Sequence, residues 1–60
     1  MSAPPHHVAV VIPAKDEAER IGATVASARA IPGVRAVVVV DDGSSDATGQ
    51  AARDAGALVV

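Results

Sequence analysis

A run of four valines that ends in two aspartates constrains the fold of this chain more than any other feature. Val37 to Val40 are β-branched, which favours a strand over a helix start, and the unbroken apolar run is typical of a strand covered on both faces. The run stops at Asp41 and Asp42, followed by Gly43-Ser44-Ser45-Asp46-Ala47-Thr48. A buried strand therefore delivers two acids to its carboxyl end, where open α/β sheets bind ligands.

Two more apolar runs and two helical patterns give a β-α-β-α-β order. Residues 8–12 predict the first strand, residues 34–40 the second and residues 57–60 the third. Parallel β-α-β crossovers are almost always right-handed. We therefore expect an α/β fold with a parallel Rossmann-like sheet in the strand order 3-2-1, packed with helices into three layers.

Each predicted helix has its own start and stop signals. Asp16 is suited to cap the first helix, with Glu19 completing a capping box and Ile31-Pro32-Gly33 as the stop. Ser44 or Ser45 is expected to cap the second helix, which should run to about residue 55. The side of the second helix that faces the sheet should consist of three alanines, Ala47, Ala51 and Ala55.

Composition and charge exclude several classes of protein. The 60 residues include no cysteine, which rules out disulfides and thiolate metal sites and suits a reducing compartment. A formal charge of −2 offers no basic surface for nucleic acid, and no apolar run approaches the roughly 20 residues of a membrane helix. We expect a cytoplasmic protein, with the cytoplasmic face of the membrane as the alternative for its full-length form.

The two ends of the chain differ in character. Residues 1–7 predict a flexible leader, whose adjacent His6 and His7 would point to opposite faces of an extended chain and make no metal site alone. The apolar run at residues 57–60 has no stop signal, so residues 8–60 are expected to be the truncated N-terminal part of a longer domain. Such a fragment should be weakly stable, catalytically inactive and prone to self-association through its open sheet edge.

The predicted sheet brings the ends of its first two strands to one edge. Pro13 to Glu17 would lie there beside Asp41 and Asp42. Carboxylates repel a bare diphosphate, but they accept hydrogen bonds from the ring N–H of a pyrimidine or guanine and from ribose hydroxyls. The backbone of Ala14 adds a further donor or acceptor. The residues therefore predict a nucleoside-binding edge, with any diphosphate held by a divalent cation whose ligands lie elsewhere.

Two segments together resemble the start of the family 2 glycosyltransferases. They are Ile12-Pro13-Ala14-Lys15-Asp16-Glu17-Ala18-Glu19-Arg20-Ile21 and Val39-Val40-Asp41-Asp42-Gly43-Ser44-Ser45-Asp46-Ala47-Thr48. The resemblance covers residues 8–60 and implies the first part of a GT-A fold. It also implies a parent enzyme that transfers sugar from a nucleotide-diphosphate sugar, with a UDP-sugar expected, to an unknown acceptor. The Mg²⁺ or Mn²⁺ of such an enzyme and its catalytic residues would be held beyond residue 60, and this segment alone would bind no metal.

The resemblance also implies roles for individual residues. Pro13, Ala14 and Glu17 would line the nucleoside pocket. Asp42 would accept a hydrogen bond from the base N–H, and Asp41 would shape the turn or assist at the ribose.

Two positions depart from the family pattern, and some acids have structural alternatives. Lys15 stands where several members have an aromatic residue, so it either reaches toward a phosphate or stays a solvated surface lysine. Asp16 stands where the family commonly has asparagine, and both residues cap helices. Glu17 and Asp46 also suit the first turn of a helix, where the macrodipole favours acids.

Two other α/β domains remain open. A Rossmann dinucleotide-binding domain needs a glycine-rich turn after its first strand, whereas residues 13–17 of this chain contain no glycine. A phospho-receiver domain, which is not an enzyme, carries its acid pair after the first strand rather than after the second.

Overall fold

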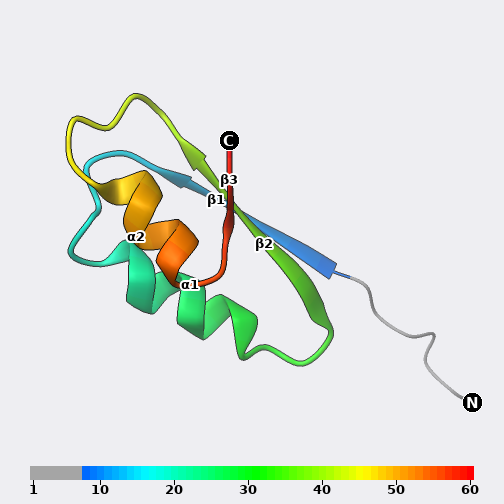
Figure 1. Cartoon of the computed structure of the whole chain (residues 1–60). Helices are drawn as coiled ribbons and strands as arrows, with labels where there is room; N and C mark the ends of the chain where they lie inside the picture. The colour runs from blue at the N-terminus through cyan, green and yellow to red at the C-terminus, as the bar shows by residue number, and fades with distance from the viewer. Residues whose placement is uncertain (1–7) are drawn as a thin grey trace, which may run out of the picture.

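The computed structural model describes residues 8–60; the predicted leader, with His6 and His7, lies outside the described residues. The elements follow one another in the predicted order (Figure 1). They are β1 (Val8–Ala14), α1 (Ile21–Arg29), β2 (Val34–Asp41), α2 (Thr48–Asp54) and β3 (Leu58–Val59). The α/β class and the β-α-β-α-β order are therefore confirmed.

The three strands form one parallel sheet with β2 in the centre. Their order, β1-β2-β3, is the predicted 3-2-1 order read from the opposite edge. After a register shift next to Val8, the pairing of β1 with β2 runs from Ala9↔Ala36 to Ala14↔Asp41, so the two strands end level with each other. β1 extends past its predicted end at residue 12 because it is an edge strand, where proline is tolerated.

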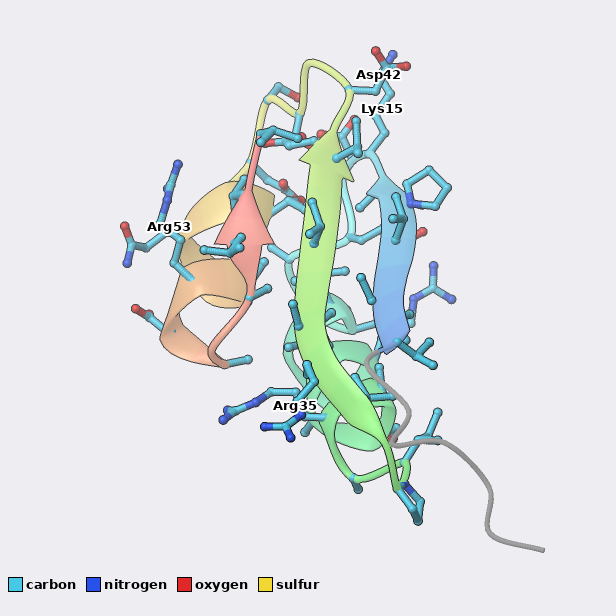
Figure 2. All side chains as sticks on the ribbon, turned by 90° about the vertical axis from the view of Figure 1, so that its right-hand side faces the viewer. Lys15, Arg35, Asp42 and Arg53 are labelled. Carbon is cyan, nitrogen blue, oxygen red and sulfur yellow. The ribbon has the colours of Figure 1, made fainter. Side chains whose placement is uncertain are left out.

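Both helices pack on the same face of the sheet (Figure 2). In β2, Val37 and Val39 point to this face and are 2% and 0% exposed. Val11 and Leu58 of the sheet, and Val60 just after β3, are exposed apolar residues. Two right-handed crossovers that add strands in the same direction place both helices on one face. Residues 8–60 therefore form two layers rather than the expected three.

The core between the helices and the sheet contains only small and medium-sized aliphatic side chains. Ile21, Val25 and Ala28 of α1 are buried, at the three-and-four spacing typical of a helix face packed on a sheet. They lie in one cluster with Val37 and Val39 of β2. The chain thus builds its core without an aromatic residue.

The first helix begins later than predicted, and the expected capping box is wrong. α1 starts at Ile21, and its N-cap residue, Arg20, makes no side-chain cap. Asp16 has a φ of 52°, in the left-handed region that aspartate tolerates better than most residues. Its carboxylate accepts from the backbone and hydroxyl of Ser45, so it is not available to the helix.

The second helix is also shifted relative to its prediction. α2 starts at Thr48, and neither predicted serine caps it, because both serines bond to the loop after β1. Because α2 starts later than predicted, a different side of this helix faces the sheet. The buried residues of α2 are Thr48, Gly49 and Ala52; of the predicted alanines, Ala51 and Ala55 are partly buried and Ala47 is exposed. A Cβ on Gly49 would stand 3.2 Å from Oδ2 of Asp41, so a side chain at this position would be tightly placed unless Asp41 shifted.

Gly56 is the position where a side chain should destabilise the end of α2. Its φ is +103°, and an added Cβ would meet the Arg29 guanidinium, which donates from Nη1 to the Ala55 carbonyl at 3.0 Å. We expect Gly56→Ala to lower the free energy of unfolding by about 1–2 kcal/mol from backbone strain alone, more if Arg29 is displaced. Chemical denaturation followed by far-UV circular dichroism measures the change.

Gly22→Ala is the matched control for this glycine. Gly22 lies inside α1 and a Cβ there meets nothing within 4 Å, so alanine should stabilise the chain by about 0.5–1 kcal/mol. Equal effects of the two substitutions would contradict the assignment of Gly56.

Candidate functional site

The carboxyl ends of β1 and β2 form one continuous edge. Ala14 pairs with Asp41, and the backbone N–H of Asp42 donates to the Ala14 carbonyl at 2.9 Å. Lys15 and Asp42 are therefore the first residues beyond the paired strands, and Figure 2 shows both side chains at this end of the sheet. Ala14 is 6% exposed, so it offers a ligand little more than its backbone. The structure brings together four of the six predicted site residues here.

The two adjacent aspartates have different surroundings. Asp41 is half-buried, and its Oδ1 accepts from the backbone N–H of Ser44 at 3.1 Å. It thus shapes the turn after β2, which was one of its two expected roles. Asp42 is exposed, and within residues 8–60 its carboxylate takes part in no hydrogen bond or ion pair. Of the two, Asp42 has the carboxylate that is free to accept hydrogen bonds from a ligand.

The other two predicted site residues lie on either side of Ala14 and Lys15. Pro13 is exposed and stands opposite Val40 in the sheet. Glu17 is half-buried, and its Oε2 lies 3.1 Å from Nη2 of Arg20, whose own side chain is 77% exposed. The Glu17 carboxylate is therefore paired within its own loop, and a ligand would have to compete with a solvated guanidinium for it.

Hydrogen bonds between residues 16–18 and residues 44–48 join the two loops, and we call them the inter-loop network. Three consecutive backbone N–H groups each donate to a different side chain: Asp16 to Ser44 Oγ (2.9 Å), Glu17 to Thr48 Oγ1 (2.8 Å) and Ala18 to Asp46 Oδ2 (3.2 Å). In return, Asp16 Oδ1 accepts from the N–H of Ser45 at 2.8 Å and from its hydroxyl at 3.2 Å. The two serines thus hydrogen-bond to Asp16 in the first loop instead of capping α2.

Asp46 is the charged member of this network. Its carboxylate accepts from the Thr48 hydroxyl and from the backbone N–H groups of Thr48 and Ala18. The hydroxyl bond, with those backbone bonds, holds the pKa of the Asp46 carboxyl below its usual value despite some desolvation. The expected place of Asp46 in the first turn of a helix is wrong, because α2 begins two residues later.

Sequence reasoning missed the role of Thr48, although a signal was present. Polar residues fill positions 44, 45, 46 and 48 after β2, more than a helix start requires, and Ser44, Asp46 and Thr48 lie two positions apart. Each of these three side chains accepts one N–H from the loop after β1. The polar side chains after this buried strand therefore bind a second loop.

A hollow of about 350 Å³ lies beside the inter-loop network. It is lined by Asp16, Glu17, Glu19, Arg20 and Asp46. Four acids and one arginine make it unfavourable for a bare phosphate. Of the predicted site residues, Glu17 alone borders this hollow. The hollow is therefore distinct from the edge formed by Lys15 and Asp42.

Residues 8–60 lack two further features. That part of the chain contains no group of three or more His, Asp or Glu side chains placed to hold a metal ion. None of its helices is both long enough and apolar enough to cross a bilayer.

Comparison with known proteins gives consistent results. The model of a family described as Glycosyl transferase family 2 matches residues 9–59. The chain is 46% identical over 54 residues to the succinoglycan biosynthesis protein ExoU of Rhizobium meliloti (strain 1021), a match that covers 90% of this chain and 16% of ExoU. A crystal structure of a mycobacterial protein superimposes with a TM-score of 0.82 at 38% identity, covering 92% of this chain and 19% of that one. The chain thus spans less than a fifth of the length of either relative.

Proposed function

This chain belongs to glycosyl transferase family 2, and on that premise we propose that residues 8–60 bind the nucleoside of a nucleotide-diphosphate sugar. They would form the N-terminal part of a longer GT-A enzyme that transfers the sugar to an acceptor. ExoU is named for succinoglycan biosynthesis, which supports a sugar-transfer step in glycan synthesis as the parent activity. We propose a UDP-sugar as donor and the cytoplasm, or the cytoplasmic face of the membrane, as the location.

One observation carries the proposal: the level ends of β1 and β2, with an exposed and unpaired carboxylate beside them. Ala14 pairs with Asp41, and the next residue, Asp42, has no internal partner for its side chain within the described residues. A charged acceptor beside an exposed strand edge suits the ring N–H of a base and the hydroxyls of a ribose.

The proposed roles follow the surroundings of each residue. Asp42 accepts from the base N–H, and Asp41 acts through the turn that it fixes with Ser44. Pro13 and the backbone of Ala14 would line the nucleoside pocket, and Glu17, in the loop that follows, would reach the ligand only by leaving Arg20. Lys15 is exposed at the same edge, and we propose that it reaches toward a phosphate of the ligand.

The proposal includes a divalent cation for the diphosphate, which we do not assign to residues 8–60. The described residues have no cluster of side chains suited to ligate a metal ion, so we assign Mg²⁺ or Mn²⁺ to none of them. Such a cation would neutralise the diphosphate that the acids of this edge otherwise repel.

The hydrogen bonds of the first loop argue against dinucleotide binding. A Rossmann domain presents free backbone N–H groups to the pyrophosphate at the start of its first helix. Here the N–H groups of residues 16–18 already donate to side chains of residues 44–48. The phospho-receiver alternative is also disfavoured. It needs a pair of free acids, whereas the carboxylate of Asp41 accepts a hydrogen bond within the turn and, among the described residues of this pair, only that of Asp42 is free.

A panel of nucleoside diphosphates tests the proposal directly. Uracil and guanine present a ring N–H that a carboxylate accepts, whereas the corresponding ring nitrogen of cytosine and adenine is an acceptor. We expect isothermal titration calorimetry of the full-length polypeptide with Mg²⁺ to show tighter binding of UDP or GDP than of CDP or ADP. Because CDP matches UDP in size and charge, it is the stringent control. Binding of NAD⁺ with no response to the four diphosphates would overturn the proposal.

A further inference from the structure

Thr48 is a buried polar residue whose hydroxyl joins the two loops of the candidate edge. Its side chain is 0% exposed, and its Oγ1 accepts from the Glu17 N–H at 2.8 Å and donates to Oδ1 of Asp46. We propose that Thr48 is a positioning residue for nucleoside binding, because it holds the backbone of Glu17 and with it the loop between β1 and α1. This inference rests on the proposed function.

Asp46 fixes the direction in which the Thr48 hydroxyl points. An ionised carboxylate only accepts hydrogen bonds, so the Thr48 proton is directed to Asp46 and an oxygen lone pair is left for Glu17. Asp46 is itself oriented by the N–H of Thr48 at 3.0 Å and by that of Ala18 at 3.2 Å. Asp46 and Thr48 therefore act as a unit in which each sets the geometry of the other.

The loop that they hold does not have a relaxed local conformation. Asp16 adopts a φ of 52°, a region that costs energy for a residue with a Cβ and persists only where surrounding contacts enforce it. Those contacts come from Ser44 and Ser45 on one side and from Thr48, through Glu17, on the other. Removing the Thr48 hydroxyl should let residues 15–17 move away from the strand edge.

Thr48→Val tests this role because valine has nearly the shape of threonine but no hydroxyl. In the full-length polypeptide we expect the Kd for UDP with Mg²⁺ to rise about tenfold. A change of this size is expected when one or two hydrogen bonds that position the loop are lost. Thr48→Ser keeps the hydroxyl and should return the Kd to within about threefold of wild type. Amide hydrogen exchange should show faster exchange at Glu17 in the valine variant and near-normal exchange in the serine variant.

Two controls separate positioning from a general loss of stability. Thr24→Val removes the hydroxyl of an exposed threonine that donates to the carbonyl of Arg20, the N-cap residue of the same helix, and it should leave the Kd unchanged. Val25→Ala removes two methyl groups from a side chain that is 0% exposed, so it should lower stability without changing the Kd at temperatures where the protein is folded.

The outcomes distinguish this inference from the proposed function. Wild-type binding of UDP with an unchanged Kd for Thr48→Val would overturn the positioning role and leave the proposed function intact. An equal loss of affinity in Val25→Ala would also overturn it, since the effect would then follow stability. A wild-type protein that binds none of the four nucleoside diphosphates would contradict the proposed function and the positioning role together.

Discussion

Val39→Asp is expected to abolish folding of this chain. Val39 is 0% exposed and lies in the central strand, where it contributes to the core cluster between the sheet and the helices. Burying an unpaired carboxylate costs several kcal/mol, whereas a chain of this length has a total stability of roughly 3–9 kcal/mol. Because no aromatic residue is present to report on packing, far-UV circular dichroism and amide NMR dispersion are the suitable measurements.

Val11→Asp provides the matched control. Val11 is also a valine within a strand, but it is 62% exposed. The same substitution there leaves the new carboxylate in water, and the 60-residue chain should keep its fold with a change of about 1 kcal/mol or less. A folded Val39→Asp variant, or equal unfolding of the two variants, would show that the core is not where the structure places it.

The strands could be predicted from the sequence because apolar runs are a local signal. The run of four β-branched valines predicts a strand over residues 34–40, and the structure extends that strand by one residue to Asp41. The number of layers was harder to predict, because a continuous valine run looks the same whether one face or both faces are covered. Val39 is fully buried while Val40 is 37% exposed, so the run is half-covered within residues 8–60. Self-association through such exposed apolar surface and the open edge of β1 stays a prediction.

The helix starts were predicted less well because the relevant hydrogen bonds are not local. Asp16 and Ser44 are both good N-cap residues in isolation, yet each finds its partner in the other loop, 28 or 29 positions away. Single-residue preferences describe what a side chain does within a few positions. The adjacency of the two loops follows from the parallel pairing of β1 with β2, so the network could be inferred only after the sheet was known.

At the candidate edge, too, some features can be predicted from the local sequence and others depend on the fold. The acids at positions 41 and 42 were predicted at the strand end from the sequence, and the structure places them there. The turn determines which of the two carboxylates is free for a ligand. The backbone N–H of Ser44 donates to the carboxylate of Asp41, and the carboxylate of Asp42 stays free within residues 8–60. The roles of Asp41 and Asp42 in binding stay predictions, and a substitution of Asp42 can test them.

Asp42→Ala should weaken UDP binding by the full-length polypeptide by about 10- to 150-fold, the loss expected when a hydrogen bond to a charged group, worth about 1.5–3 kcal/mol, is removed. The preference for UDP over CDP should disappear with it, since both depend on the same carboxylate. Asp42 is exposed and its side chain has no internal bond within residues 8–60, so the alanine should not lower stability.

Asp54→Ala controls for the change in net charge. Asp54 is an exposed acid of α2 whose carboxylate accepts from the Gln50 amide four residues earlier, an exposed pair that contributes little to stability. Removing it changes the net charge by the same amount but should leave both the affinity for UDP and the discrimination against CDP unchanged in calorimetry. If both variants lose affinity equally, the effect is one of net charge, and the carboxylate of Asp42 does not contact the base. If Asp42→Ala alone loses both affinity and discrimination, the hydrogen bond is to the base N–H, because a contact with ribose would weaken UDP and CDP alike.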